Sequence, residues 1–308
     1  MPLAKLAHLT DRGVVRVTGP DAEKFLNGSI TADLGMLAKQ AAVHSALLTP
    51  QGKLMFEFFA LKAPDGDTPA FLLETAREQA DALVKRLNLF RLRAKVEAEN
   101  VSAGYEVAAC WGGAAPAGSA KRIVYADPRL PELGARLLAV VPPGFAADPG
   151  DLEGEAEWVA EAAYHVHRVA LGVPEAGRDF PIGDTFPHEA DLDQLHGVSF
   201  AKGCFVGQEV VARMKHKGIV RKRVVPVEGD AALTAGAPVT VGEVEIGRIG
   251  SVAGTRGLAM LRLDRAAEAK AKGQPLLAGG VVIALHKPAW ATFELDPAAA
   301  AQPTAGKA

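Results

Sequence analysis

Residues 200–218 contain the side chains of this sequence that are best suited to chemistry. The segment reads F-A-K-G-C-F-V-G-Q-E-V-V-A-R-M-K-H-K-G and holds Cys204, one of only two cysteines in 308 residues. Gly203 and Gly207 flank the thiol, and Lys202 precedes it by two residues. Glycine has no Cβ, so the backbone around it can turn tightly or come close to a partner. We therefore predict a tight loop that presents the thiol of Cys204.

A short helix is predicted to follow this loop. Gln208 and Glu209 open a helical pattern, and Gly218 is a natural stop. The positive end of a helix and a nearby lysine both favour a thiolate over a thiol. Cys204 is therefore a candidate nucleophile, with Lys202 as the group that activates it.

The alternative is that Cys204 only packs in a core, because free cysteine is among the most buried residue types. Its neighbours argue against that alternative. Lysine, two glycines, glutamine and glutamate surround the thiol, and apolar packing requires none of them. We therefore favour the functional interpretation.

The composition is that of an ordinary soluble globular protein. A net charge of −2, with 49% hydrophobic and 23% charged residues, excludes both an acidic tail and a strongly basic nucleic-acid binder. The length of 308 residues predicts two or three domains. Cys110 and Cys204 do not make a disulfide framework, which favours a reducing compartment. Without a leader after Met1 or an apolar run of about 18 residues, we expect a cytoplasmic protein with no membrane partner.

Strand and helix patterns are mixed in the N-terminal part of the chain. Extended patterns occupy residues 14–18, 43–48, 53–60, 70–74 and 94–98. Helical patterns occupy residues 22–28, 80–87 and 158–169, and loops rich in Gly, Ala and Pro are expected at 108–120 and 142–154. Thr49-Pro50-Gln51-Gly52 suits a type I turn, which predicts a hairpin between the second and third strands. Because strands and helices do not alternate strictly, we predict an α+β fold rather than a doubly wound sheet.

The rest of the chain changes from a loop pattern to strand patterns. Residues 173–199 show little periodicity, and a long ordered loop is more often functional than not. Glycine-punctuated strand patterns predict a small antiparallel barrel or sandwich; they occupy residues 224–227, 239–246, 248–252, 258–263 and 281–285. Residues 296–308 are rich in Ala, Pro and Gly and are predicted to be disordered.

The octapeptide K-G-C-F-V-G-Q-E closely resembles the corresponding loop of the YgfZ-type folate-binding proteins, which are relatives of the glycine-cleavage T-protein. Three weaker stretches support the resemblance in the expected order: D-A-E-K-F-L-N-G-S-I-T-A-D at 21–33, L-L-T-P-Q-G-K-L at 47–54 and F-P-H-E-A-D-L-D at 186–193. The resemblance covers nearly the whole chain, from Asp11 to about Thr292.

The resemblance implies a T-protein-like α+β fold, with its parts in a ring and folate in a central hole. Residues 1–222 would form a discontinuous folate-binding region of two α+β subdomains, residues 223–295 a C-terminal antiparallel β-barrel, and residues 296–308 a disordered tail. It also implies tetrahydrofolate, or another folate derivative, as the cofactor, and iron–sulfur client or assembly proteins as partners. The implied role is assembly or repair of iron–sulfur clusters by an accessory factor, which we expect to be a monomer.

The resemblance carries specific residues over to this chain. The catalytic group would be Cys204, with Lys202 beside it. The predicted folate-binding residues are Asn27, Asp33, Gly203, Gly207, Gln208, Glu209 and Arg213. A pterin edge needs a donor–acceptor pair, and Gln, Glu, Asn and Arg side chains supply such groups. For Asn27 and Asp33, a role in a turn is the alternative.

A folate-dependent aminomethyltransferase is the alternative function, because the T-protein has the same architecture. That enzyme keeps a pair of aspartates after the hairpin turn, where this chain has Phe56 and Glu57. It also keeps a glutamate for the pterin, where this chain has Ala170. Phenylalanine cannot serve as an acid or base, and alanine cannot hydrogen-bond a pterin edge. We therefore rank the transferase second.

Two further kinds of site are weighed and not expected. A basic cluster surrounds His216 and consists of Arg213, Lys215, Lys217, Arg221, Lys222 and Arg223. A polyglutamate tail or RNA would suit such a cluster, but the overall charge and the lack of interleaved aromatics argue against a nucleic-acid partner. We interpret the cluster as a solvated helix end. His188, His196 and His216 lack C-x-x-C or H-x-x-x-H spacing, so no all-protein metal site is expected.

Overall fold

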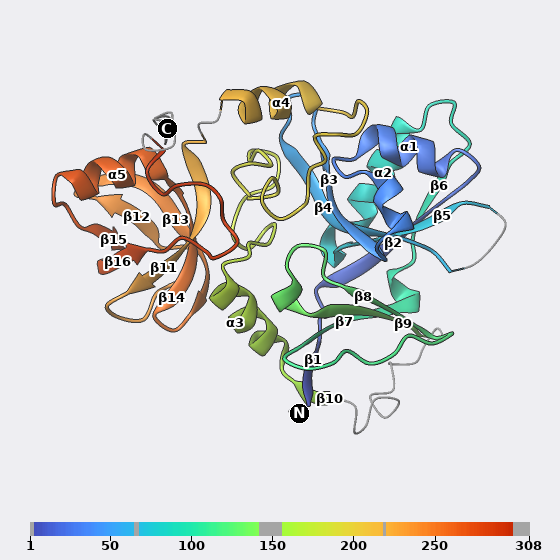
Figure 1. The fold of residues 1–308 in the computed structure, drawn as a ribbon, viewed down its shortest axis with the longest axis horizontal. Coiled ribbons are helices and arrows are strands. Elements are labelled where there is room, and N and C mark those ends of the chain that lie inside the picture. Colours follow the sequence, from blue (N-terminus) through green and yellow to red (C-terminus); the bar gives the residue numbers. More distant parts are fainter. Residues whose placement is uncertain (1–2, 65–67, 142–155, 218–219, 298–308) are drawn as a thin grey trace, which may run out of the picture. The chain divides into compact units, whose positions relative to one another are not determined.

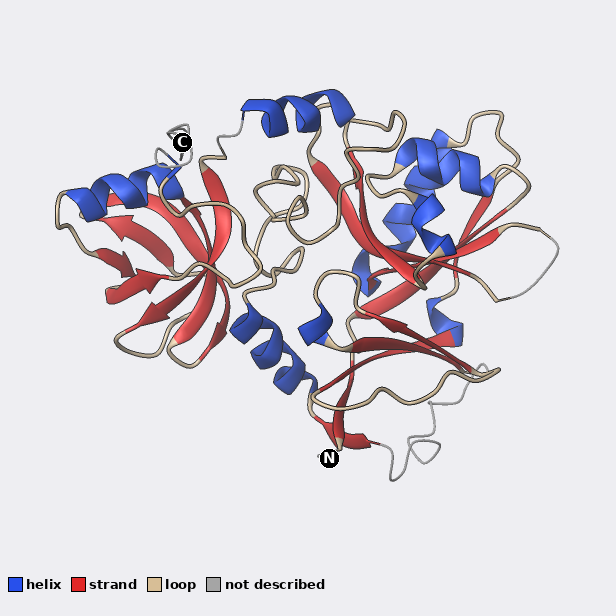
Figure 2. Cartoon of the chain, viewed as in Figure 1, coloured by secondary structure: helices blue, strands red, loops and turns tan. Residues whose placement is uncertain are grey.

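The computed structural model describes residues 3–64, 68–141, 156–217 and 220–297 (Figures 1 and 2). These residues form two five-stranded sheets and one closed barrel. The chain folds into two compact units. Unit 1 comprises Met1–Pro50, Met55–Tyr164 and Leu195–Val206, and unit 2 comprises Gln51–Leu54, His165–Gln194 and Gly207–Ala308.

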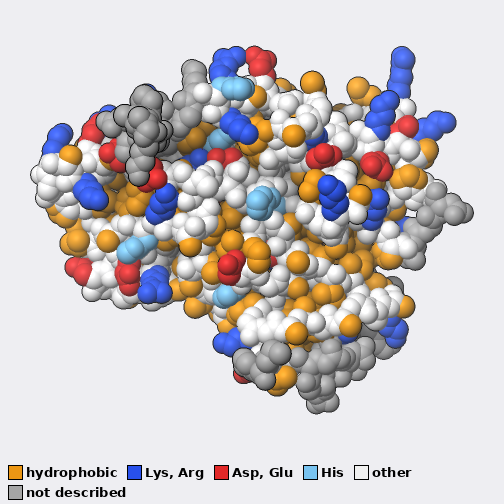
Figure 3. All heavy atoms as spheres, viewed as in Figure 1, with side chains coloured by type: hydrophobic (Ala, Val, Ile, Leu, Met, Phe, Trp, Pro, Cys, Tyr) orange, Lys and Arg blue, Asp and Glu red, His pale blue; other side chains and the backbone are white. Residues whose placement is uncertain are grey.

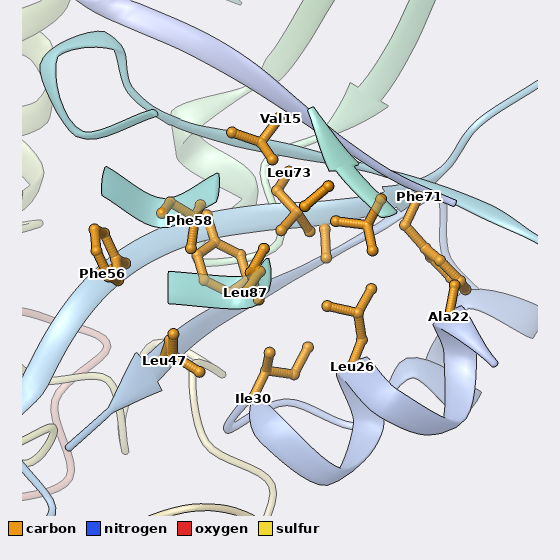
Figure 4. Packing of buried hydrophobic residues seen from close by; sticks show 14 of the residues in the cluster. Val15, Ala22, Leu26, Ile30, Leu47, Phe56, Phe58, Phe71, Leu73 and Leu87 are labelled. Atoms are coloured by element: carbon orange, nitrogen blue, oxygen red, sulfur yellow. The ribbon is translucent and has the colours of Figure 1, made fainter. Parts of the chain in front are cut away.

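Unit 1 contains a sheet that carries helices on one of its faces. Its strands, in the order β3-β4-β5-β2-β6, are β2 (Arg12–Thr18), β3 (Ala42–Leu48), β4 (Leu54–Lys62), β5 (Ala70–Ala76) and β6 (Glu97–Asn100). The helices that pack on it are α1 (Ala22–Ser29) and α2 (Ala80–Phe90). Alternate strand residues such as Phe58 and Leu73 meet Leu26 of α1 and Leu87 of α2 in a buried apolar core (Figure 4).

A second sheet in unit 1 joins strands from distant parts of the sequence. In order across the sheet they are β10 (Ala156–Val159), β1 (Ala4–His8), β7 (Tyr105–Trp111), β9 (Ala135–Val140) and β8 (Arg122–Ala126). Strands β1 and β10 are parallel, and the other neighbours are antiparallel. Leu6, Cys110 and Leu137 lie in the apolar core of this sheet, and burial raises the pKa of the Cys110 thiol.

Unit 2 contains the barrel. Its strands, in the order β11-β14-β13-β12-β15-β16, are β11 (Lys222–Gly229), β12 (Pro238–Val241), β13 (Val244–Ala253), β14 (Arg256–Arg262), β15 (Leu276–Ala278) and β16 (Val281–Leu285). Helix α5 (Leu263–Ala271) adds Leu263 to an apolar core that includes Val225 and Leu261. The structure thus confirms the predicted α+β class and the antiparallel β-barrel. The predicted domain bounds stay predictions, and residues 298–308 of the predicted tail lie outside the described residues.

The described residues also contain four short 3-10 helices: η1 (Leu34–Ala38), η2 (Arg77–Gln79), η3 (Ser102–Gly104) and η4 (Pro131–Leu133). Two α-helices, α3 (Glu161–Leu171) and α4 (Gln208–Lys217), flank a long segment without helix or strand, as predicted. Among the described helices, none combines the length and the apolar composition that crossing a bilayer requires.

Buried arginines tie the part of this segment that belongs to unit 2, residues 172–194, to the rest of that unit. The guanidinium of Arg168, in α3, donates to the carboxylate of Asp179 at 2.5 Å and to the hydroxyl of Ser251 in β13 at 2.7 Å. Arg223, at the start of β11, donates to Asp191 at 2.7 Å and to both oxygens of Asp193. The predicted solvated basic cluster is therefore wrong for Arg223, which is 3% exposed and held by carboxylates.

Three local predictions are wrong. Residues 108–111, predicted as a loop, belong to β7, where they pair with β1, and residues 108–110 also pair with β9. Trp158, predicted on a helix, lies in β10, where it pairs with β1. Residues 239–246, predicted as one strand, form a hairpin that turns at Gly242, whose φ is +57°. In each case a partner strand far along the chain, or a turn within an apolar run, decides the backbone conformation.

Candidate functional site

The cysteine loop, residues 200–207, is irregular backbone that leads into α4. Cys204 is exposed, whereas Cys110 is buried in β7. Gly207 has a φ of +80°, a conformation that favours glycine, and α4 begins directly after it at Gln208, as predicted. A Cβ at Gly203 would meet no heavy atom within 4 Å, so sterics do not require glycine there.

Lys202 anchors the cysteine loop to the segment between α1 and η1. Its ammonium donates to the carbonyl oxygens of Asn27 (2.6 Å), Ile30 (2.9 Å) and Ala32 (2.6 Å). An ammonium has three N–H donors, so these contacts use all of them. Lys202 is therefore a positioning residue for the loop, and its direct activation of Cys204 stays a prediction.

The surroundings of Lys202 also change its proton affinity. Burial lowers the pKa of Lys202 to about 8, and the nearby carboxylate of Asp33 opposes this shift. The ammonium lies 5.4 Å from the centre of the Phe205 ring in the same loop.

Asn27 and Asp33 have the turn roles that the sequence left open as an alternative. The side-chain oxygen of Asn27 accepts from the backbone N–H of Leu34 at 3.1 Å, and Asp33 caps η1 by accepting from Gly35 at 2.9 Å. Within the described residues, these bonds leave the amide nitrogen of Asn27 and the second carboxylate oxygen of Asp33 unused. The structure therefore brings Lys202, Asn27 and Asp33 together, although about 170 residues separate them.

The predicted ligands Gln208, Glu209 and Arg213 lie in α4, in unit 2. Glu209 and Arg213 form an i,i+4 ion pair of 2.9 Å, with both side chains largely exposed. Such an exposed pair contributes little to stability. A Cβ at Gly52, in the turn of residues 51–54, would lie 3.0 Å from the Cβ of Val210, so this glycine lets the turn approach α4 closely within unit 2.

The sequence analysis missed a buried charge layer that joins residues of the two sheets of unit 1. Its members are Arg12, His44, Glu57, Glu74, Tyr125, Asp127, Arg129, Arg136 and Tyr164. Glu74, in β5, accepts from Arg12 at 2.9 Å and from Arg136 in β9 at 3.0 Å, and Tyr125 donates to its other oxygen. Two opposite charges on a single carboxylate offset the cost of burying it.

Further contacts extend this layer. Burial opposes a charge on Asp127, but the charge and hydrogen bonds of Arg129 lower the pKa of Asp127 to about 2. His44 lies 2.8 Å from Glu57 through its Nε2 and 2.9 Å from the carbonyl oxygen of Leu195 through its Nδ1. The ring of Phe59 faces three guanidiniums at 4.9–5.9 Å.

One sequence signal could have found this layer. Glu74 stands in the apolar strand A-F-L-L-E-T-A, and Arg136 in A-R-L-L-A-V. A charged side chain within a buried strand requires a partner of opposite charge, so each of these positions predicts an ion pair. The identity of the partner does not follow, because it comes from another strand.

Comparisons with known proteins agree with this architecture. The family described as "CAF17, C-terminal beta-barrel domain" matches residues 221–293, which contain the barrel strands. The human protein named "Iron-sulfur cluster assembly factor IBA57, mitochondrial" is 35% identical over 283 residues, covering 82% of this chain and 76% of the human protein. The chain belongs to the IBA57 family. The mouse IBA57 protein is 33% identical and is covered to 77%.

Fungal IBA57 homologues are longer than the matched part. The Mycosarcoma maydis homologue is 36% identical over 235 residues, and the match covers 72% of this chain but 57% of that protein. Among solved structures, the glycine cleavage system aminomethyltransferase T from Bartonella henselae superposes with a TM-score of 0.73, covering 94% of this chain and 86% of that chain. Its sequence identity of 18% means that the likeness concerns the fold alone.

The prediction of a cytoplasmic protein is wrong. The IBA57 relatives from human, mouse and Mycosarcoma maydis are named as mitochondrial proteins. The prediction depended on cysteine usage and on the sequence after Met1. Cysteine usage does not distinguish the cytoplasm from another reducing compartment.

Proposed function

We propose that this chain acts in the assembly or repair of iron–sulfur clusters, with the thiol of Cys204 as its reactive group. The observation that carries the proposal is the exposure of Cys204 on an anchored loop, in contrast to the buried Cys110. The names of the IBA57 relatives, which are iron–sulfur cluster assembly factors, support the same role.

The residues of the loop have distinct tasks in this proposal. A thiolate is the form of cysteine that binds iron or attacks an electrophile. Lys202 holds the loop through three carbonyl oxygens, and Gly207 permits the turn into α4. Iron–sulfur clusters usually have four protein ligands, so one cysteine can bind a cluster only with ligands from a partner or a small thiol.

The test is complementation by Cys204→Ala in a strain that lacks the gene. We expect the variant to fold normally and to leave the activity of cluster-dependent enzymes unrestored, because the alanine has no thiolate. Cys110→Ala is the matched control and should restore these activities. Full complementation by Cys204→Ala would remove the thiol from the function.

We further propose that the chain binds a reduced folate. The resemblance to folate-binding proteins supports this ligand, and the unused donor of Asn27 and acceptor of Asp33 are the groups that a pterin edge requires. Tetrahydrofolate titration, followed by tryptophan fluorescence, tests it. Asp33→Asn keeps a side-chain oxygen for the η1 cap but loses the charge, so we expect it to bind tetrahydrofolate about tenfold more weakly. Glu23→Gln is the control and should bind like the parent. Equal affinities for both variants and the parent would exclude Asp33 as a ligand.

An accessory role is favoured over an aminomethyltransferase. Phe56 lies in the apolar core, and Glu57 is engaged by His44. Ala170 is exposed on α3 and carries no polar side-chain atom. Glycine-dependent formation of methylene-tetrahydrofolate in a reconstituted cleavage assay would reverse this ranking.

A further inference from the structure

The end of α2 and the loop that follows it are strongly basic. Residues 85–95 read K-R-L-N-L-F-R-L-R-A-K and contain five positive charges and no acidic residue, in a chain whose net charge is −2. The side chain of Arg86 lies over the ring of Phe90, and Arg91 donates to the carbonyl oxygen of Val96 at 2.7 Å. Lys85 and Arg93 are exposed. Figure 3 shows several lysine and arginine side chains, with a few acidic ones among them, on the part of the molecule that holds α1 and α2.

Two leucines stand exposed among these charges. Leu89 is 66% exposed and Leu92 is 89% exposed, the highest fraction among the exposed large hydrophobic side chains of the described residues. Leu92 also has a φ of +45°, which is unfavourable for a residue with a Cβ. A leucine this exposed buries little apolar surface within the fold, so together with its backbone conformation it is a candidate contact for another molecule.

A pocket of about 670 Å³ lies beside these leucines in unit 1. Its wall includes Leu89 and Phe90 at the end of α2, Leu92 after it, and Phe25 of α1. It also includes Val206, two residues after Cys204 in the cysteine loop. The pocket is therefore continuous with the loop that carries the exposed thiol.

We propose that the pocket and the basic segment beside it dock an acidic iron–sulfur protein. This basic–apolar surface consists of the pocket with Leu89, Leu92 and the charges of residues 85–95. The partner would insert an apolar side chain into the pocket and place carboxylates around it, facing Lys85 and Arg93. The net positive charge selects an acidic surface, and the shared wall at Val206 brings the docked protein to Cys204. The identity of the partner as an iron–sulfur protein depends on the proposed function.

The other charges near the pocket are compatible with this assignment. Asp21 lies in the pocket wall, but one of its carboxylate oxygens accepts from the backbone N–H of Lys95 at 2.8 Å. Glu23 lies on the first turn of α1, where the helix dipole favours it. Single-stranded RNA would call for aromatic faces on which bases stack, and a lipid surface would leave a concave pocket unfilled.

Binding to a plant-type [2Fe–2S] ferredoxin, used as an acidic iron–sulfur probe, tests the proposal with the full chain. We expect measurable affinity that falls steeply between low salt and about 0.5 M salt. Leu92→Glu should weaken ferredoxin binding about tenfold or more. The double variant Lys85→Glu with Arg93→Glu should weaken it by a similar factor and should also make the affinity less dependent on salt. The control for Leu92→Glu is Leu3→Glu, the same substitution at another exposed leucine. The control for the double variant is Lys39→Glu with Lys62→Glu, which changes the net charge by the same amount.

Parallel titrations with a tRNA and with phosphatidylglycerol vesicles separate the alternatives. The proposal would be overturned if the tRNA or the vesicles bound in a way that depends on Leu92 and Arg93 while ferredoxin did not bind. It would also be overturned if the control variants lost as much ferredoxin affinity as the docking variants. Circular dichroism of Leu92→Glu and of Lys85→Glu with Arg93→Glu confirms that a loss of binding is not a loss of fold. Complementation by Cys204→Ala tests the proposed function alone, and the ferredoxin affinities of the docking variants test this surface alone.

Discussion

Single side chains hold the irregular parts of this chain in place. The cysteine loop contains no helix or strand, and Lys202 replaces regular backbone bonding with three contacts to carbonyl oxygens. Arg223 has the same task in unit 2, where it holds the segment around Asp191. In both places one cation satisfies several acceptors that the loop would otherwise bury without a donor.

Arg223 also sets the protonation of two neighbouring aspartates. It supplies one positive charge to two carboxylates. Burial raises the pKa of Asp191 to about 8, whereas the hydrogen bonds and charge of Arg223 outweigh the effect of burial on Asp193 and lower its pKa. Asp193 therefore keeps the negative charge, and Asp191 keeps a proton at neutral pH.

The first prediction concerns Asp191→Asn. The folded pKa of Asp191 lies above its ordinary value of 3.8, so its contribution to stability is fully present below about pH 4 and is lost as the pH rises through about 8. The variant cannot ionise, and asparagine tolerates the φ of +60° at this position. We expect the free energy of unfolding of the variant to rise relative to that of the parent as the pH rises, by on the order of 1.4 kcal/mol for each pH unit within this window.

Urea unfolding between pH 4 and pH 9 measures this difference. Asp193→Asn is the contrasting variant, because it removes the carboxylate that carries the negative charge beside Arg223 and should lower the free energy of unfolding above pH 4. Parallel pH profiles of the parent and Asp191→Asn would contradict a raised pKa at Asp191.

Strand alternation explains how one sheet can present an apolar face and a charged face. In β2 and β5, Val15 and Leu73 point toward α1 and α2, while Arg12 and Glu74 point to the opposite side. The apolar face is covered by helices, and the charged face by residues of the second sheet, such as Arg136. The charge layer thus joins the two sheets of unit 1.

The second prediction is that Glu74→Gln lowers the free energy of unfolding by about 3–5 kcal/mol, because Arg12 and Arg136 then stay buried without this counter-charge. Glu78→Gln, an exposed position a few residues away, should change it by less than about 0.5 kcal/mol. Urea unfolding at neutral pH measures both. Equal stability of the two variants would mean that the ion pairs contribute no more than neutral hydrogen bonds.

At the scale of the molecule, the two units have separate apolar cores and separate tryptophans. Trp111 and Trp158 belong to unit 1, and Trp290 belongs to unit 2, where its indole N–H donates to the carbonyl oxygen of Leu171 at 2.8 Å. Each core contains residues of its own unit. Separate cores favour separate unfolding transitions.

The third prediction follows from this division. Glu74→Gln should shift the unfolding transition reported by Trp111 and Trp158, and Asp191→Asn at pH 8 should shift the transition reported by Trp290. Comparing the fluorescence of Trp290→Phe with that of the parent separates the two signals. A single transition that moves with both substitutions would show that the units unfold as one.

Local features of this chain followed from the sequence alone. The start of α4 after a glycine-flanked loop, the β3–β4 hairpin and the C-terminal barrel all match the predictions. The signals for these features, which are helical spacing, turn chemistry and alternation, lie within a few consecutive residues. Such signals act before distant parts of the chain meet.

Only the tertiary structure decided the rest. Nothing near Lys202 in the sequence indicates that its acceptors lie near Asn27, and nothing near Glu74 points to Arg136. Trp158 was misplaced for the same reason, because its strand exists through pairing with β1. Charge pairing and sheet pairing depend on groups that are far apart along the chain, so their partners are determined only when the chain has folded.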